Sequence, residues 1–124
     1  MRKGERVSLS IYCVTPAYTL KEALDQISEN HNRNVFVVDE GKVVGILSQG
    51  DAVRALCRGA DILQSISGLY SPTFFYLRSR DMSAAKELVK DKGVTLIPVV
   101  DEGFSLVDVI TPADVIASLE EEVQ

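Results

Sequence analysis

The chain contains the same short sequence twice. Residues 36–41 read FVVDEG, and residues 98–103 read PVVDEG at an offset of 62. A second matched block follows each copy at an offset of 63, with SQGD at residues 48–51 and TPAD at residues 111–114. Self-similarity at a fixed period indicates a duplicated supersecondary unit. This duplication constrains the fold more than any other feature of the sequence.

Each copy is close to the lower size limit for a unit that is stable alone, since it has about 55 residues. We therefore expect two units, residues 1–60 and 61–124, whose sheets pack against each other and share one core. Trp is absent and the chain has only four Phe and four Tyr, so this core is predicted to be aliphatic.

The two units follow the same pattern of strand, helix, two strands and helix. Thr19 begins the first helix with Glu22 three residues on, which is the spacing of a capping box. Short runs rich in β-branched residues predict the strands, and a D-E-G turn joins each hairpin. The expected strands are residues 11–14, 35–38 and 43–47 in the first unit and 74–77, 96–100 and 106–110 in the second. The expected helices begin at Thr19, Ser48, Asp81 and Thr111.

The second helix of each unit carries apolar residues at helical spacing, which we expect to face the core. The expected inward positions are Val53 and Leu56 in the first unit and Val115, Ile116 and Leu119 in the second. Residues 120–124 are expected to form a frayed, solvated end.

The net charge of −5 argues against unspecific binding to nucleic acid, which needs a basic surface. Arg2, Lys3 and Arg6 form a short basic segment that we interpret as solvated. No apolar run is long enough to predict a membrane span. Cys13 and Cys57 are isolated, which predicts reduced thiols and a cytoplasmic protein.

The repeated order, with an apolar strand ending in V-V-D and then G-[IVL]-[IVL]-[ST]-x-x-D before a helix, resembles the CBS domain pair, also called a Bateman module. Residues 45–51 read GILSQGD and residues 108–114 read DVITPAD. The resemblance covers roughly residues 8–120. The copies depart from the pattern differently: the first has Phe36 where the second has the typical Pro98, and the second has Asp108 in place of the glycine.

The resemblance implies an α+β fold with α/β character, in which two β-α-β-β-α units form a pseudo-twofold pair. It implies two clefts that can bind AMP, ADP, ATP or S-adenosylmethionine, with no required cofactor, metal or catalytic residue. It also implies a homodimer that regulates an attached or associated enzyme or transporter.

The residues that match the family's binding motif are Ser48 and Thr111, implied to contact phosphate, and Asp51 and Asp114, implied to bind ribose hydroxyls. Elementary chemistry agrees, because a carboxylate accepts both hydroxyls of a ribose and a helix N-terminus attracts phosphate. The complete set of predicted ligand-binding residues is Thr15, Gly45, Ser48, Asp51, Pro98, Thr111 and Asp114.

The resemblance further implies that Thr15 lines the cleft completed by Asp114, with Ser71 or Thr73 as its weaker equivalent at the other cleft. A carboxylate at Asp108 could repel a phosphate, so we expect two unequal clefts, with Gly45 favouring the one built on Ser48 and Asp51. Four cations could meet phosphates, although each is more typical of a surface charge. These are Arg33, Arg54, Arg78 and Lys92.

Three alternatives are left open by the residues themselves. The S-x-x-D and T-x-x-D motifs are also ordinary capping boxes that need no ligand. The module could be a dimerisation or scaffold unit that binds no nucleotide. A small enzyme is disfavoured, because the lone His31 supports neither a zinc site nor a catalytic triad and no phosphate-binding glycine loop is present.

Overall fold

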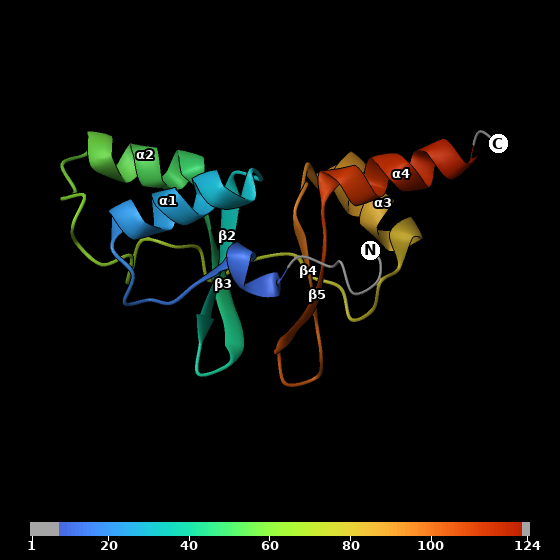
Figure 1. The fold of residues 1–124 in the computed structure, drawn as a ribbon, viewed down its shortest axis with the longest axis horizontal. Coiled ribbons are helices and arrows are strands. Elements are labelled where there is room, and N and C mark those ends of the chain that lie inside the picture. Colours follow the sequence, from blue (N-terminus) through green and yellow to red (C-terminus); the bar gives the residue numbers. More distant parts are fainter. Residues whose placement is uncertain (1–7, 123–124) are drawn as a thin grey trace.

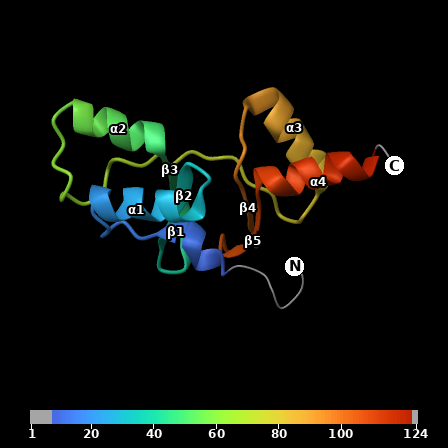
Figure 2. The ribbon, with the colours of Figure 1, turned by 45° about the horizontal axis from the view of Figure 1, so that its top comes forward.

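The computed structural model describes residues 8–122 and confirms the tandem α+β fold (Figure 1). The basic residues Arg2, Lys3 and Arg6 lie outside this range. The helices of the first unit lie toward one end of the molecule and those of the second unit toward the other, with the two hairpins between them in both views (Figures 1 and 2).

The first unit comprises a 3-10 helix η1 (Leu9–Tyr12), β1 (Cys13–Val14), α1 (Leu20–Asn30), β2 (Asn34–Asp39), β3 (Lys42–Ser48) and α2 (Gln49–Cys57). The second comprises α3 (Met82–Lys92), β4 (Ile97–Val100), β5 (Leu106–Ile110) and α4 (Pro112–Glu122).

The two units have related but unequal sheets. In the first, β1 runs parallel to β2, which is antiparallel to β3. In the second, β4 and β5 form a hairpin, and Leu77 alone makes a parallel bridge to Val99. The predicted strand over residues 74–77 is therefore reduced to one residue. The predicted strand over residues 11–14 is also shorter, because its first half belongs to η1.

The predicted shared core is present. Successive side chains of a strand point to opposite faces, so Val35 and Val37 of β2 pack against α1 while Phe36 faces the second unit. Each unit also has a core of its own between its helices and its sheet. The buried residues of the shared cluster are Phe36, Val43, Leu96, Val100 and Val109.

The connecting segment, residues 58–81 between α2 and α3, packs mainly on the first unit. Ile66 is fully buried in the core of unit one, and its N–H donates to the carbonyl of Tyr18 (2.9 Å). The N–H of Leu20, in the first turn of α1, donates to the carbonyl of Gln64 (2.9 Å). The boundary between residues 60 and 61 stays a prediction, and these contacts attach the start of the connecting segment to the first unit.

The predicted inward faces of α2 and α4 are wrong at three positions. Val53, Ile116 and Leu119 are 47%, 56% and 47% exposed, whereas Ala52 and Val115 are buried. The physical reason is that each of these helices touches its unit on one narrow side, so the apolar stripe is wider than the contact.

The end of α4 also differs from the expectation. It stays helical to Glu122, whose carboxylate pairs with Lys86 of α3, so the predicted fraying from residue 120 is wrong within the described chain. No helix within residues 8–122 has the length and apolarity needed to cross a membrane.

Candidate functional site

The hydroxyls of both predicted motifs cap helices. Ser48 Oγ accepts the N–H of Asp51 at the start of α2 (3.0 Å), and Thr111 Oγ1 accepts the N–H of Asp114 at the start of α4 (3.2 Å). In α4 the capping box is complete, because Asp114 Oδ2 accepts the N–H of Thr111 in return (2.9 Å). Ser48 and Thr111 are therefore confirmed as helix caps, and the full capping box is confirmed at Thr111 and Asp114. Each carboxylate lies at a helix N-terminus.

Asp51 forms an ion pair along its own helix. Its Oδ1 lies 2.5 Å from an N–H nitrogen of Arg54, three residues on, and the Arg54 side chain is 60% exposed. The carbonyl of Arg33 accepts the N–H of Gln49 (2.8 Å), so the backbone of Arg33 also lies at this helix N-terminus. Of the four candidate cations, Arg54 thus has its side chain at the first turn of α2, whereas Arg33 contributes its backbone carbonyl.

Asp114 is paired by a residue that the sequence analysis missed. Arg80 lies 3.2 Å from Asp114 Oδ2 and 3.1 Å from Asp108 Oδ2, and it donates to the carbonyl of Val109 (3.3 Å). Burial disfavours the charged guanidinium, but the hydrogen bonds and negative charges of Asp108 and Asp114 outweigh it and raise the pKa of Arg80. The carboxylate that replaces the motif glycine is therefore held by a cation.

The N-terminal segment of unit one reaches this site in unit two. Tyr12 in η1 packs in the shared core, and burial together with the charge of Asp114 raises the pKa of its phenol. Thr15 follows three residues later in an exposed turn, where its Oγ1 accepts the N–H of Ala17 (3.3 Å). The structure thus brings the start of unit one to the Asp114 side, although the hydrogen bonds described for Thr15 are local.

Gly45 serves the packing of the connecting segment. A Cβ at this position would lie 2.3 Å from Tyr70 Cδ1 and 2.4 Å from the carbonyl oxygen of Ser71. Ser71 in turn exchanges two 2.9 Å backbone hydrogen bonds with Ile46 of β3. Tyr70 and Ser71 therefore fill the space beside Gly45, which lies on β3, the strand that leads to Ser48.

The predicted equivalence of Thr15 with Ser71 or Thr73 is wrong in register. Val14 pairs with Val37 of β2, and Leu77 pairs with Val99 of β4. Val99 is the repeat counterpart of Val37, 62 residues further on, so Leu77 is the counterpart of Val14. The residue after Leu77 is Arg78, so Arg78 is the counterpart of Thr15. Its guanidinium lies over the rings of Phe104 (4.8 Å) and Tyr76 (5.3 Å) and donates to the carbonyl of Asp101.

Pro98, the remaining predicted site residue, is buried in β4. It occupies the position of Phe36 in the repeat, and its carbonyl accepts the N–H of Leu77 (3.0 Å). Its described role is thus to hold the connecting segment on the second sheet.

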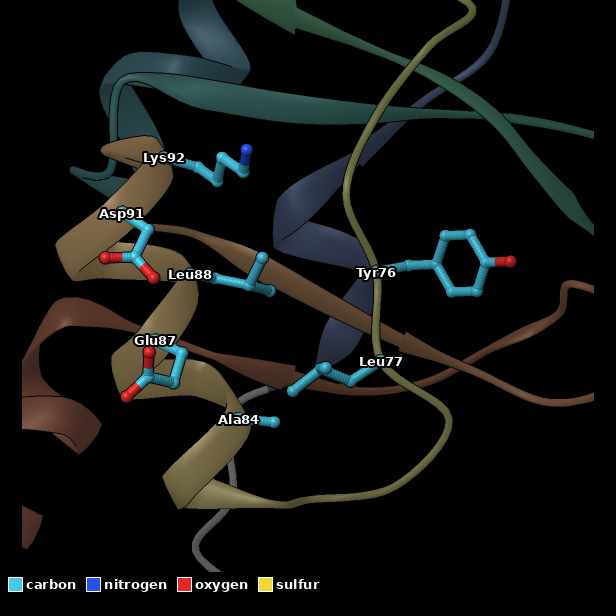
Figure 3. A pocket seen from close by; sticks show the side chains of 7 residues that line it. All are labelled: Tyr76, Leu77, Ala84, Glu87, Leu88, Asp91 and Lys92. Carbon is cyan, nitrogen blue, oxygen red and sulfur yellow. The ribbon is translucent and has the colours of Figure 1, made fainter.

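An open cavity of about 350 Å³ lies elsewhere, between α3 and the segment before it (Figure 3). Apolar groups line most of its wall. None of the seven predicted ligand-binding residues lines it, although Lys92, one of the four candidate cations, does. Its lining residues are Tyr76, Leu77, Ala84, Glu87, Leu88, Asp91 and Lys92. We regard the helix N-termini as the better candidates, because they concentrate donors and carboxylates. Within the described residues, no three His, Cys, Asp or Glu side chains are grouped so that they could hold a metal ion.

Comparison with known proteins identifies the repeat. The family described as "CBS domain" matches residues 6–58 and again residues 78–121. The magnesium transporter MgtE of Thermus thermophilus is 34% identical over 90 residues, which are 71% of this chain and 19% of the transporter. The arabinose 5-phosphate isomerase GutQ of Salmonella typhi is 30% identical over 116 residues, covering 92% of this chain and 35% of the isomerase. The chain therefore spans only a fifth to a third of these relatives.

Solved structures share the fold. The cytosolic domain of the Mg²⁺ channel MgtE in complex with ATP has a TM-score of 0.70 at 28% identity, covering 86% of this chain and 44% of that one. A CBS domain pair/ACT domain protein of Thermotoga maritima has a TM-score of 0.77 at 22% identity and 95% coverage of both chains. A CBS domain protein of Pyrobaculum aerophilum complexed with AMP has a TM-score of 0.71 at 16% identity, covering 88% of this chain and 90% of that one.

The family match covers more than half of the chain, falls on both copies of the repeat, and agrees with the fold of the solved relatives. The chain belongs to the CBS domain family and is a tandem CBS pair, the architecture of a regulatory module.

Proposed function

We propose that this CBS pair is a sensor that binds an adenosine-type ligand, such as AMP, ADP, ATP or S-adenosylmethionine, in clefts between its two units. The observation that carries the proposal is the placement of Asp51 and Asp114 on the first turns of α2 and α4, where backbone donors and a carboxylate lie together. Such a pair of groups suits a phosphate and a ribose diol at once. Two structures with this fold are described as complexes with ATP and with AMP.

The regulated protein is proposed to be an enzyme or transporter that is attached to this module or associated with it. The relatives support this class of partner, since one is a magnesium transporter and another is a sugar-phosphate isomerase. In each of them the matched segment is a minor part of a longer protein.

Isothermal calorimetry with AMP, ADP, ATP and S-adenosylmethionine tests the sensor function. We expect Asp51→Asn and Asp114→Asn each to remove one binding site. The matched control is Asp25→Asn, which changes an exposed carboxylate paired with Lys21 on α1 and is expected to keep both sites. Absence of binding for the whole panel at millimolar ligand contradicts the proposal. Full binding by both test variants would show instead that neither carboxylate contacts the ligand.

A second candidate function is a dimerisation module, and the exposed apolar residues of α2 and α4 favour it. Val53 and Ile116 occupy equivalent positions of the repeat, and both are about half exposed. Leu119 extends the apolar stripe along α4. A pair of these stripes in a homodimer would remove apolar surface from water, which favours association.

A further inference from the structure

Arg80 connects three parts of the second unit. It immediately precedes Asp81, the residue that caps α3 by accepting the N–H of Ala84 (3.1 Å). From there its guanidinium reaches Asp108 in β5 and Asp114 in α4. The Asp108 side chain is only 16% exposed, and the carbonyl of Val109 accepts a further hydrogen bond from the same guanidinium. The cation is thus anchored on one side by β5 while it pairs with Asp114 on the other.

One oxygen of Asp114 already has two partners. Its Oδ2 accepts the N–H of Thr111 at 2.9 Å and lies 3.2 Å from a guanidinium nitrogen of Arg80. A ribose diol donates two hydroxyls, which a single carboxylate binds best with both of its oxygens. A ligand that binds Asp114 in this way must therefore compete with Arg80 for Oδ2.

The cation that pairs with Asp51 is held less firmly than Arg80. Its partner, Arg54, lies three residues on in the same helix and has a side chain that is 60% exposed. Pairs of this kind contribute little and open readily, because water replaces the lost partner at small cost. A ligand can therefore displace Arg54 from Asp51 more easily than it can displace Arg80 from Asp114.

We infer that Arg80 is an internal competitor for the ligand at Asp114, so that the two clefts fill in a fixed order. The cleft at Asp51 binds first, and the cleft at Asp114 fills only at higher ligand concentration, when Arg80 is released. The inference rests on the proposed adenosine-type ligand. It adds that the cleft at Asp51 responds at low ligand concentration and the cleft at Asp114 at high ligand concentration. Because Arg80 adjoins the cap of α3, its release also links the second binding event to the start of that helix.

The test is a calorimetric titration with adenosine, which lacks the phosphate that would itself attract Arg80. Arg80→Gln removes the cation and retains a polar side chain, and it is expected to tighten the weaker site about fivefold, the effect of losing one modest ion pair. The added Asp114→Asn substitution should abolish that site and so assign it. Arg54→Gln is the matched control, with the same chemical change at Asp51, and is expected to alter affinity by less than about twofold.

The outcomes separate the two proposals. Binding by the wild-type protein that Arg80→Gln leaves unchanged or weakens overturns the role of Arg80 alone. Absence of adenosine binding by the wild type and every variant overturns this inference, whereas the sensor function is decided by the panel of AMP, ADP, ATP and S-adenosylmethionine. Arg80→Lys keeps the charge but not the planar fork that spans Asp108 and Asp114, so an intermediate affinity is expected and supports competition through that fork. The circular dichroism of each variant establishes that it is folded.

Discussion

The backbone N–H of Val43 donates a 2.8 Å hydrogen bond to the carbonyl of Phe104. Val43 belongs to the hairpin of the first unit and Phe104 to the hairpin turn of the second, so this bond joins the two copies of the repeat. Phe104 has a left-handed backbone (φ 67°), and its ring packs edge-on against Tyr76 with the ring centres 4.9 Å apart. The turn therefore contributes a backbone acceptor to the contact between the units, and the side chain of Phe104 packs against their shared core.

Phe104→Ala should lower the free energy of unfolding by about 2 kcal/mol, less than for a fully buried phenylalanine because this ring is only partly buried. The lost contacts include those with the rings of Phe74 and Tyr76 and with the guanidinium of Arg78. Urea denaturation measures the change. Phe75→Ala is the control, since Phe75 is 46% exposed and should contribute only about 1 kcal/mol. Equal losses for both variants would contradict a special role for Phe104.

Local patterns were sufficient to predict most of the fold. The capping box at Thr19, the aliphatic strand runs and the duplicated D-E-G turns depend on neighbouring residues, and the structure confirms them. The shared core was also predictable, because one copy is too small to bury its apolar faces alone. These are properties that a repeat makes visible within a single sequence.

Contacts between distant residues were not predictable in the same way. Nothing near Arg80 in the sequence indicates that it meets Asp108 and Asp114, which lie 28 and 34 residues further along the chain. Helical periodicity identified the apolar stripe of α4 but could not tell how much of it the sheet covers, so Ile116 was misplaced. Likewise, the pairing of Leu77 with Val99 depends on the sheet and moves the counterpart of Thr15 to Arg78.

Gly45→Ala should destabilise the protein by about 2–3 kcal/mol. The new Cβ would lie 2.4 Å from the backbone oxygen of Ser71, so the connecting segment must shift and its pairing with Ile46 weakens. Gly50→Ala in the first turn of α2 is the matched control. The nearest atom to its Cβ is 3.5 Å away, and alanine favours the helix, so stability should stay equal or rise by a few tenths of a kcal/mol. Thermal denaturation of the two variants measures the difference.

The apolar residues on α2 and α4 predict a change of oligomeric state. We expect the wild-type chain to have twice the 13.6 kDa protomer mass in light scattering, and Val53→Glu combined with Ile116→Glu to have the protomer mass. Burying two charges without partners in the interface costs more than the contact contributes. Val107→Glu, at a residue of β5 that is 49% exposed, is the control and should keep the wild-type mass. A wild-type chain that stays at protomer mass at high concentration would contradict the dimer.

The two thiols should differ strongly in reactivity. Burial raises the pKa of Cys13 to about 11, whereas Cys57 is exposed. At pH 8 only about one part in a thousand of Cys13 is then thiolate, the reactive form, and this fraction rises tenfold for each unit of pH. Ellman's reagent should label one thiol rapidly and the other at least about a hundredfold more slowly, since burial also limits access. Cys57→Ser should remove the fast phase, and urea should make Cys13 react rapidly. Comparable native rates for both thiols at pH 8 would show that Cys13 is more accessible than its position beside η1 implies.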